Sequence, residues 1–197
     1  MAIITLSRGC YSHGQKIADL VAKRLNYTLI DREILVEAAA SFDVSERTLL
    51  KSLHDAPGVL ERITRGRERY LTMIRASVLA YARHDNMIYA GHAGHLLLPR
   101  AKHVLRVRII ADLDLRIKDL QEREGVTKAK ALDYIQEEDR HREDWTRYLY
   151  NKDIKDPTLY DLVIHLGQID DTDAAEVICL AAQSPSFTPT PKSQQII

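Results

Sequence analysis

The N-terminal segment constrains the fold most, because it predicts a strand, a loop and a helix in direct succession. An apolar run begins at Ile3 and stops at Ser7, and a small, polar, glycine-containing loop follows. Beyond Gly14, apolar residues recur at helical spacing at Ile17, Leu20, Val21 and Leu25. Such a loop directs several backbone N–H groups and the positive end of a helix dipole to one point, so its natural ligand is a phosphate.

The two glycines of this loop, Gly9 and Gly14, fit the front half of a P-loop, G-x-x-x-x-G-K-[ST]. The back half departs from that pattern. Gln15 stands where the phosphate-binding lysine is expected, and Lys16 stands where the Mg²⁺-binding Ser or Thr is expected. An ordinary turn between a strand and a helix, with two glycines, explains the same stretch. The loop alone does not decide between the two interpretations.

Composition excludes several classes of protein. Lys plus Arg equals Asp plus Glu at 28 each, so the formal net charge of zero argues against a nucleic acid polymer or an anionic membrane as partner. Cys10 and Cys179 are too few for a disulfide scaffold or a cysteine-rich zinc site. No apolar run approaches membrane-spanning length, and no secretory signal is evident at the N-terminus. We therefore expect a cytoplasmic protein.

Strand and helix signals alternate along the chain, which predicts an α/β fold with a five-stranded parallel sheet and helices on both faces. Strands are expected at 3–7, 27–30, 86–90, 104–111 and 161–166, and helices at 14–25, 71–82, 112–125, from 127 onward, and at 171–182. The charged segment 139–148 has few apolar residues, so it is either a mobile lid or a plain surface helix. The Pro-, Ser- and Thr-rich tail 184–197 is expected to be disordered.

Polar residues at the ends of the predicted strands are candidate ligand-binding groups. Asp31 follows the second strand, where it is well placed as a helix N-cap and where ligands of open α/β sheets lie. Gly91 follows the third strand and suggests a close approach of the backbone to a ligand. The nearby His92 and His95 are too few for a convincing metal site and are expected to be polar loop residues.

Two groups of arginines have competing interpretations. Arg62, Arg65 and Arg69 fall on one helical face, where interleaved glutamates favour a solvated surface over a phosphate-binding cluster. Arg106 and Arg108 share one face of the fourth strand by period-two alternation. We expect both on a half-exposed face or facing a ligand cleft rather than in the core.

Several collinear stretches carry a further signal. They are residues 4–14, 29–35, 91–98, 104–107, 116, 122–125, 139–142 and 156–164. In this order and at these spacings, the sequence resembles the cytidylate-kinase-like family of P-loop nucleotide kinases from Ala2 to about Ala182. The resemblance implies a three-layer P-loop core (1–32, 85–123 and 151–183), a helical acceptor lobe at about 33–84 and a lid at about 124–150.

The resemblance also implies transfer of the ATP γ-phosphate to a nucleoside monophosphate, CMP or dCMP by family, with Mg²⁺, in a monomer or homodimer. Arginines of the lid would close over the transferring group and exclude water. Catalytic roles fall to Arg140, Arg142, Arg147 and Lys16. ATP would contact Ser7, Arg8, Gly9, Ser12, His13, Gly14, Gln15, Lys16, Ile17 and, near the adenine, Arg116 or Arg123. The acceptor would contact Asp31, Arg32, Arg62, Arg65, Arg69, Gly91 and His92, and Ser7 or Ser12 would bind Mg²⁺.

Two departures from the family pattern leave the activity open. The loop ends in Gln15-Lys16, and His92 with Ala93 occupies the turn where cytidylate kinases carry a Gly-Arg-Asp stretch. Arg8 or Lys16 is expected to supply the missing positive charge. The alternative to a kinase is a nucleotide-binding sensor with a degenerate P-loop. A purely structural interaction protein would leave the distribution of arginines unexplained.

Overall fold

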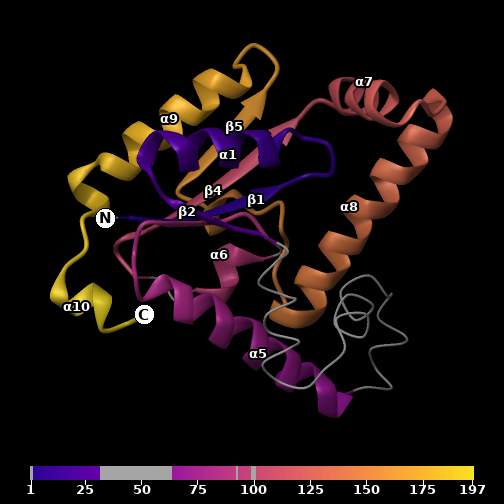
Figure 1. Cartoon of the computed structure of the whole chain (residues 1–197). Helices are drawn as coiled ribbons and strands as arrows, with labels where there is room; N and C mark the ends of the chain where they lie inside the picture. Colours follow the sequence, from indigo (N-terminus) through magenta and orange to yellow (C-terminus); the bar gives the residue numbers. More distant parts are fainter. Residues whose placement is uncertain (1, 32–63, 92, 99–100) are drawn as a thin grey trace.

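The first strand of the chain is the central strand of the sheet. The computed structural model describes residues 2–31, 64–91, 93–98 and 101–197 (Figure 1). The strands are β1 (Ile3–Arg8), β2 (Thr28–Ile30), β3 (Met87–Tyr89), β4 (Val104–Ala111) and β5 (Leu162–Leu166). The helices are α1 (Gly14–Leu25), α5 (Thr64–Ala82), α6 (Gly94–Leu97), α7 (Leu113–Glu124), α8 (Lys128–Tyr150), η2 (Pro157–Leu159), α9 (Asp171–Gln183), η3 (Pro185–Phe187) and α10 (Pro191–Gln194).

The five strands run in the order β2-β3-β1-β4-β5, and every pairing between them is parallel. This arrangement confirms the predicted parallel sheet. The register places Thr5 beside Arg106 and Ser7 beside Arg108. Because side chains alternate between the two faces of a strand, these four polar residues share one face of the sheet.

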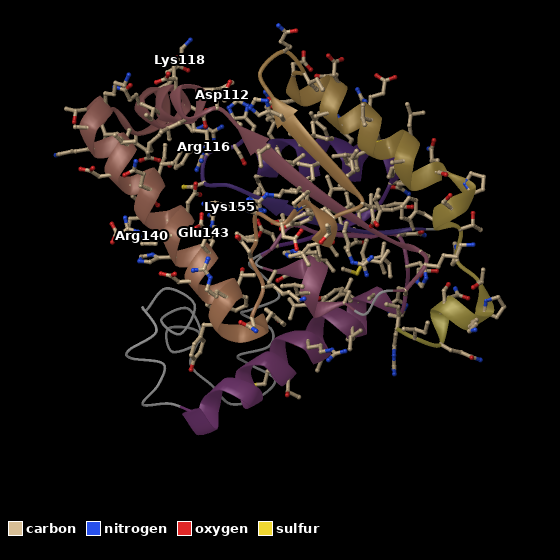
Figure 2. All side chains as sticks on the ribbon, turned by 180° about the vertical axis from the view of Figure 1, so that it is seen from behind. Asp112, Arg116, Lys118, Arg140, Glu143 and Lys155 are labelled. Carbon is tan, nitrogen blue, oxygen red and sulfur yellow. The ribbon has the colours of Figure 1, made fainter. Side chains whose placement is uncertain are left out.

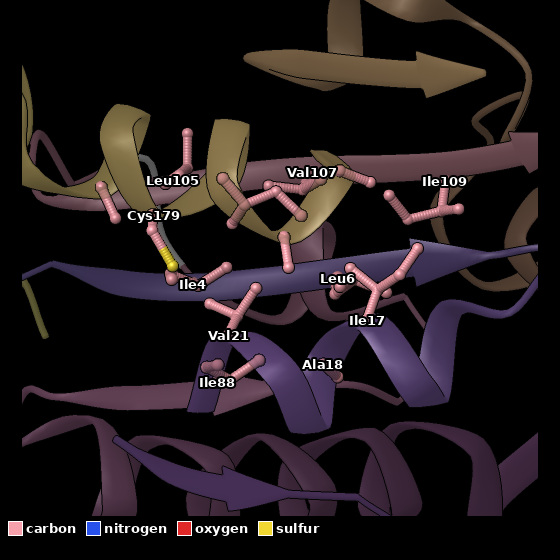
Figure 3. Close-up of a cluster of buried hydrophobic side chains, with 14 of the residues drawn as sticks. Ile4, Leu6, Ile17, Ala18, Val21, Ile88, Leu105, Val107, Ile109 and Cys179 are labelled. Carbon is pink, nitrogen blue, oxygen red and sulfur yellow. The ribbon is translucent and has the colours of Figure 1, made fainter. Parts of the chain in front are cut away.

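Helices α1 and α9 cover the opposite face. Ile4 and Leu6 of β1 point into this layer, where Ile17 and Val21 of α1 pack against them (Figure 3). All four side chains are at most 1% exposed. Helix α9 completes the layer with Ala174, Ala175, Ile178, Cys179 and Ala182. The helical spacing after Gly14 therefore predicted the buried side of α1 correctly.

Helices α5, α6 and α8 supply the second layer. Their residues Val78, Leu97 and Trp145 join Ile3 of β1 in a separate apolar cluster. Helix α6 was not predicted, because its four residues are too few to show a helical period. The expected acceptor lobe at 33–84 lies outside the described residues except for 64–84, most of which is α5. No helix within the described ranges is long and apolar enough to cross a membrane.

Helix α8 is held at both ends, and Trp145 is the anchor that lies within the charged segment 139–148. Ala131 and Ile135 pack with Ile117 of α7 in a third cluster, and Trp145 is 8% exposed in the second cluster. These anchoring residues are only a few positions of a 23-residue helix, so the charged majority hides them in the sequence.

Arg106 is also placed differently from its prediction. Arg106 is only 6% exposed, and its guanidinium donates to the Val104 carbonyl at 3.2 Å. Asp161, the residue before β5, lies 3.7 Å from the same Nη1 atom and accepts the Arg106 backbone N–H at 2.8 Å. Burial of this arginine is tolerated because Asp161 supplies a counter-ion.

The tail after residue 183, which the composition predicts to be disordered, carries two short helices in the structure. Pro185 and Pro191 each start a short helix. A proline is tolerated at the first position of a helix, because the N–H that it lacks would have no partner within the helix there. Thr190 and Ser193 form a capping box at the start of α10. Phe187 packs on the first apolar cluster, and Ile197 packs on the second.

Candidate functional site

The loop between β1 and α1 is turned by residues other than its glycines. Tyr11 and His13 adopt left-handed conformations, with φ of 53° and 54°. Gly14 instead makes room for an arginine, and Gly9 lies against another. A Cβ on Gly14 would lie 2.5 Å from the Arg8 side chain, and one on Gly9 would touch Arg116 at 3.4 Å. The glycine spacing thus marks close packing of cationic side chains on the loop.

A cleft of about 440 Å³ opens beside this loop. Its walls come from the loop, the carboxyl-terminal half of β4, helices α7 and α8, and the segment that leads to β5. Figure 2 shows Arg116, Glu143 and Lys155, which line the cleft from three separate segments. The cleft therefore lies at the carboxyl ends of the central strands, where open α/β sheets bind their ligands.

The lining of the cleft carries an excess of positive charge. Its described lining includes five cationic side chains, Arg8, Arg108, Arg116, Arg142 and Lys155, and two carboxylates, Asp139 and Glu143. Guanidinium groups match the geometry of phosphate oxygens, and a cleft of one sign of charge concentrates ligands of the opposite sign. The arrangement is suited to a ligand with several negative charges, such as a polyphosphate.

Arg116 lies against the loop and is only 9% exposed. Its Nε donates to the Cys10 carbonyl at 2.6 Å, and its Nη2 lies 2.7 Å from Asp139 Oδ2. The other Asp139 oxygen accepts the Cys10 backbone N–H at 2.9 Å. Burial raises the pKa of the Cys10 thiol to about 11, so this cysteine stays protonated and is no nucleophile.

Arg8 connects the ends of three strands. Its Nη1 donates to the Ala90 carbonyl after β3, and its Nη2 lies 3.6 Å from Asp31 after β2. Burial lowers the pKa of the Arg8 guanidinium, and the charge of Asp31 opposes that effect. Arg142 of α8 donates to the Arg8 carbonyl at 3.2 Å. The expected cofactor-binding Arg8, the expected acceptor-binding Asp31 and the expected catalytic Arg142 are thus brought together.

Lys16 is directed away from the cleft. Its Nζ lies 2.7 Å from Asp171 on α9, and His13 Nδ1 lies 2.9 Å from the same carboxylate. Burial alone would raise the pKa of Asp171, but the hydrogen bonds to Lys16 and His13 prevail and lower it. Neither Lys16 nor His13 lines the cleft, so the loop has no lysine of its own directed into it.

Ser7 belongs to a buried polar cluster behind the cleft, together with Arg108, Tyr160 and His95. Arg108 Nη1 lies 3.2 Å from the Tyr160 hydroxyl and 3.5 Å from Ser7 Oγ. The Tyr160 hydroxyl donates to the Ile154 carbonyl at 2.9 Å and lies 3.3 Å from His95 Nε2. Burial, reinforced by the charge of Arg108, lowers the pKa of His95 to about 3. His95 is therefore neutral and structural, and it lies buried in α6 rather than in the loop where it was expected.

Ser12 has a different place from Ser7. It lines the cleft, and its hydroxyl donates to the Gly9 carbonyl at 2.9 Å. Among the described residues, no group of three His, Cys, Asp or Glu side chains is placed to hold a metal ion. Of the two serines considered for Mg²⁺, only Ser12 faces the space where a ligand could lie.

The remaining predicted residues lie outside the cleft or outside the described part. Arg140 and Arg147 are exposed, and Arg123 pairs with Asp119 at 2.8 Å on α7. Gly14, Gln15, Ile17 and Gly91 do not line the cleft. Arg32, Arg62 and His92 fall outside the described residues; Arg65 and Arg69 lie in α5, but their side chains are not described.

Three charged residues that line the cleft were missed as site residues. Asp139, Glu143 and Lys155 come from α8 and from the segment that follows it. Lys155 Nζ lies 2.7 Å from Glu143 Oε1. Asp139 stands in one of the family-like stretches, which was a usable signal. Nothing in the sequence distinguishes Glu143 and Lys155 from other charged surface residues.

The sheet order, the covering helices and the loop define a three-layer α/β fold of the P-loop kinase type. A protein of Eubacterium ventriosum has the same fold, with a TM-score of 0.72 and 23% identity over 93% of this chain and 99% of its own. The shikimate kinase of Bacteroides thetaiotaomicron gives a TM-score of 0.55 and 12% identity over 93% of this chain and 99% of its own. Likeness at these identities concerns the fold.

The chain belongs to the cytidylate kinase-like family, whose sequence profile matches residues 3–168. A cytidylate kinase of Sulfolobus acidocaldarius is 34% identical to it over 95 residues, which are 48% of this chain and 51% of that enzyme. The match thus spans about half the length of this curated relative.

Proposed function

We propose that this protein is an ATP-dependent phosphotransferase that moves the γ-phosphate of ATP to a nucleoside monophosphate, CMP or dCMP, or to a related small acceptor. The observation that carries the proposal is the cleft, which joins a phosphate-type loop to five cationic side chains. Phosphoryl transfer depends mainly on positioning and on neutralisation of charge, and these are the properties that such a cleft supplies.

The described residues divide into a donor side and an acceptor side. On the donor side, the Cys10 N–H and the Arg116 guanidinium would bind phosphate oxygens, and Arg142 would approach the transferring group from α8. Lys155 would add the positive charge that Lys16 does not bring into the cleft. On the acceptor side, Asp31 and Arg8 lie together at the carboxyl ends of β2 and β1.

Mg²⁺ fits this cleft as a cation bound mostly through the nucleotide. In proteins it usually takes one or two side-chain oxygens and completes its coordination with phosphates and water. The Ser12 hydroxyl lines the cleft and could provide such an oxygen, whereas Ser7 lies behind Arg108. The ion would neutralise charge on the polyphosphate.

The second candidate function is a nucleotide-binding sensor with little or no kinase activity. The observation in its favour is the position of Lys16, which is paired with Asp171 outside the cleft. Arg142 favours the kinase, because binding alone does not require a cationic side chain from α8 over the loop. The two candidates differ in whether ADP release depends on an acceptor.

The test offers ATP with Mg²⁺ and a panel of nucleoside monophosphates to the purified protein and follows ADP release. We expect turnover with CMP or dCMP. Arg142→Ala should lower kcat by about a hundredfold or more, as removal of one stabilising donor does in other enzymes. Lys130→Ala, an exposed residue of the same helix, is the matched control and should keep its activity. ATP binding without any acceptor-dependent turnover would instead support the sensor.

A further inference from the structure

The phosphate-type loop already holds an anion that belongs to the chain itself. The carboxylate of Asp139 on α8 accepts the Cys10 N–H at 2.9 Å and contacts the Arg116 guanidinium at 2.7 Å. These two donors come from different segments, the loop and α7. A backbone N–H and a guanidinium that converge on one point are the kind of donors that bind a phosphate oxygen.

Contacts with Cys10 and Gly9 of the loop hold the Arg116 guanidinium in this position. Its Nε donates to the Cys10 carbonyl at 2.6 Å, and its guanidinium lies over Gly9, where a Cβ would meet it at 3.4 Å. Arg116 is 9% exposed, so its charge requires a partner in the same place. Asp139 is that partner in this structure.

We propose that Asp139 is an internal competitor for the phosphate chain of the ligand. The carboxylate and a phosphate group cannot share the Cys10 N–H and the Arg116 guanidinium, because two anions at hydrogen-bonding distance repel each other strongly. A binding polyphosphate therefore takes the place of Asp139 and leaves Arg116 with a new counter-ion. The inference rests on the proposed function only in naming a polyphosphate as the ligand.

This exchange couples the loop to α8. While Asp139 occupies the loop, the central part of α8 is drawn against Cys10. When the carboxylate leaves, the contact of Arg142 with the Arg8 carbonyl and the contact of Tyr134 with Tyr11 would still hold α8 against the loop. The apparent affinity for the ligand is reduced by the fraction of molecules in which Asp139 occupies the site.

A purely positioning role for Asp139 makes the opposite prediction. If the carboxylate only holds Arg116 in place for the ligand, its removal should weaken binding, since a disordered arginine binds less well. If it competes with the ligand, its removal should strengthen binding. The sign of the change therefore distinguishes the two roles.

The experiment titrates inorganic tripolyphosphate into the full chain and measures the dissociation constant by isothermal calorimetry. Asp139→Asn keeps the size of the side chain and removes its charge; we expect tripolyphosphate to bind about tenfold more tightly. Asp139→Ser should change the affinity in the same direction. Asp133→Asn removes the same charge from an exposed position of α8 and should leave the dissociation constant unchanged.

Unchanged or weaker binding by both Asp139 variants, with thermal unfolding showing that they are folded, would overturn the inference. Adding Arg116→Gln to Asp139→Asn should abolish the gain, because the donor that the carboxylate masks is then missing. The outcome is independent of phosphoryl transfer. Tighter tripolyphosphate binding without turnover would support the inference and reject the kinase. Turnover without tighter binding by the Asp139 variants would support the kinase and reject the inference.

Discussion

At the scale of single residues, Arg108 links the cleft to the buried cluster behind it. It lines the cleft, and its Nη1 also contacts Tyr160, whose hydroxyl lies next to His95. Burial and the charge of Arg108 both disfavour a protonated imidazole at His95. The cationic wall of the cleft is thus backed by a neutral histidine.

His95 should make the stability of the protein fall in mild acid. Burial first, and then the charges of Arg108 and Arg106, lower its folded pKa to about 3, whereas an unfolded histidine takes up a proton near pH 6.5. The stabilisation is thus present above pH 6.5 and is lost as the pH falls. Between pH 6.5 and pH 5 the loss should be about 2 kcal/mol.

Urea unfolding at pH 7.5 and pH 5.0 measures this effect. His95→Gln should be less dependent on pH than the wild type over that interval. His84→Gln changes an exposed histidine and should behave as the wild type does. An equal loss of stability in the wild type and in His95→Gln would show that the imidazole is not the group responsible.

The sequence predicted some individual side chains and not others, for a physical reason. Arg8, Gly9, Ser12 and Arg116 were assigned to the site, and the structure places all four along the cleft. Lys16 follows Gly14 by only two positions, yet its side chain turns to Asp171, a residue far along the chain. The position of Lys16 in the sequence could not predict this contact, because its partner comes from a distant part of the chain.

At the scale of elements, the start of α1 is tied to the start of α9. Lys16 and His13 both contact the Asp171 carboxylate, which lies in the first turn of α9. The first turn of a helix also favours an acidic residue through its dipole. The contact therefore holds the loop against a helix that belongs to the core.

Asp171→Asn should lower the free energy of unfolding at pH 7 by on the order of 1 kcal/mol. Asp171 has a lowered folded pKa, so its stabilisation is present above the unfolded pKa near 4 and disappears as the pH falls below it. The difference between variant and wild type should shrink at pH 3. Asp173→Asn lies in the same first turn and controls for the helix dipole. Denaturant unfolding at both pH values supplies the comparison; equal losses in the two variants would assign the effect to the dipole.

Long elements could be predicted from the sequence, because hydrophobic periodicity reports directly on the face that is buried. The limits of β4 and α1 agree with the residue ranges expected from that pattern. Helix α6 has four residues, and the tail forms its short helices only against the two apolar clusters. Such elements depend on contacts that a local pattern does not contain.

At the scale of the whole molecule, the C-terminal residues pack near the N-terminal end of β1, at the end of the sheet away from the cleft. Ile197 packs against the apolar cluster that contains Ile3 and Trp145. The side chain of Gln194 donates to Asp85 at 3.1 Å, just before β3. Figure 1 shows the C-terminus beside the N-terminal end of β1, while the loop lies at the other end of that strand.

The packing of the tail against the core can be tested with two adjacent residues. Ile197→Ser should lower the free energy of unfolding by about 1 kcal/mol, because part of an isoleucine side chain is withdrawn from the apolar cluster. Ile196 is 48% exposed, so Ile196→Ser should change little. Thermal or urea unfolding provides the measurement. Equal effects of both substitutions would indicate that the tail does not dock as the structure shows.

The complete lining of the cleft could not be predicted from the sequence. Residues of the loop, β4, α7, α8 and the segment before β5 meet only once the sheet has formed. Charged residues of α8 look alike along the sequence, and the fold alone decides that Asp139 and Arg142 face the loop while Arg140 faces solvent.

The left-handed conformations of Tyr11 and His13 have a consequence for how such loops are compared across related proteins. Each costs roughly 1–2 kcal/mol for a residue with a side chain, a cost that local contacts must offset. Tyr11 stacks edge-on with Tyr134, and His13 contacts Asp171. A survey of relatives that counts glycines would therefore miss the positions that shape this loop. Divergence at 11 and 13, or at the residues that support them, should mark relatives whose loop has changed its course.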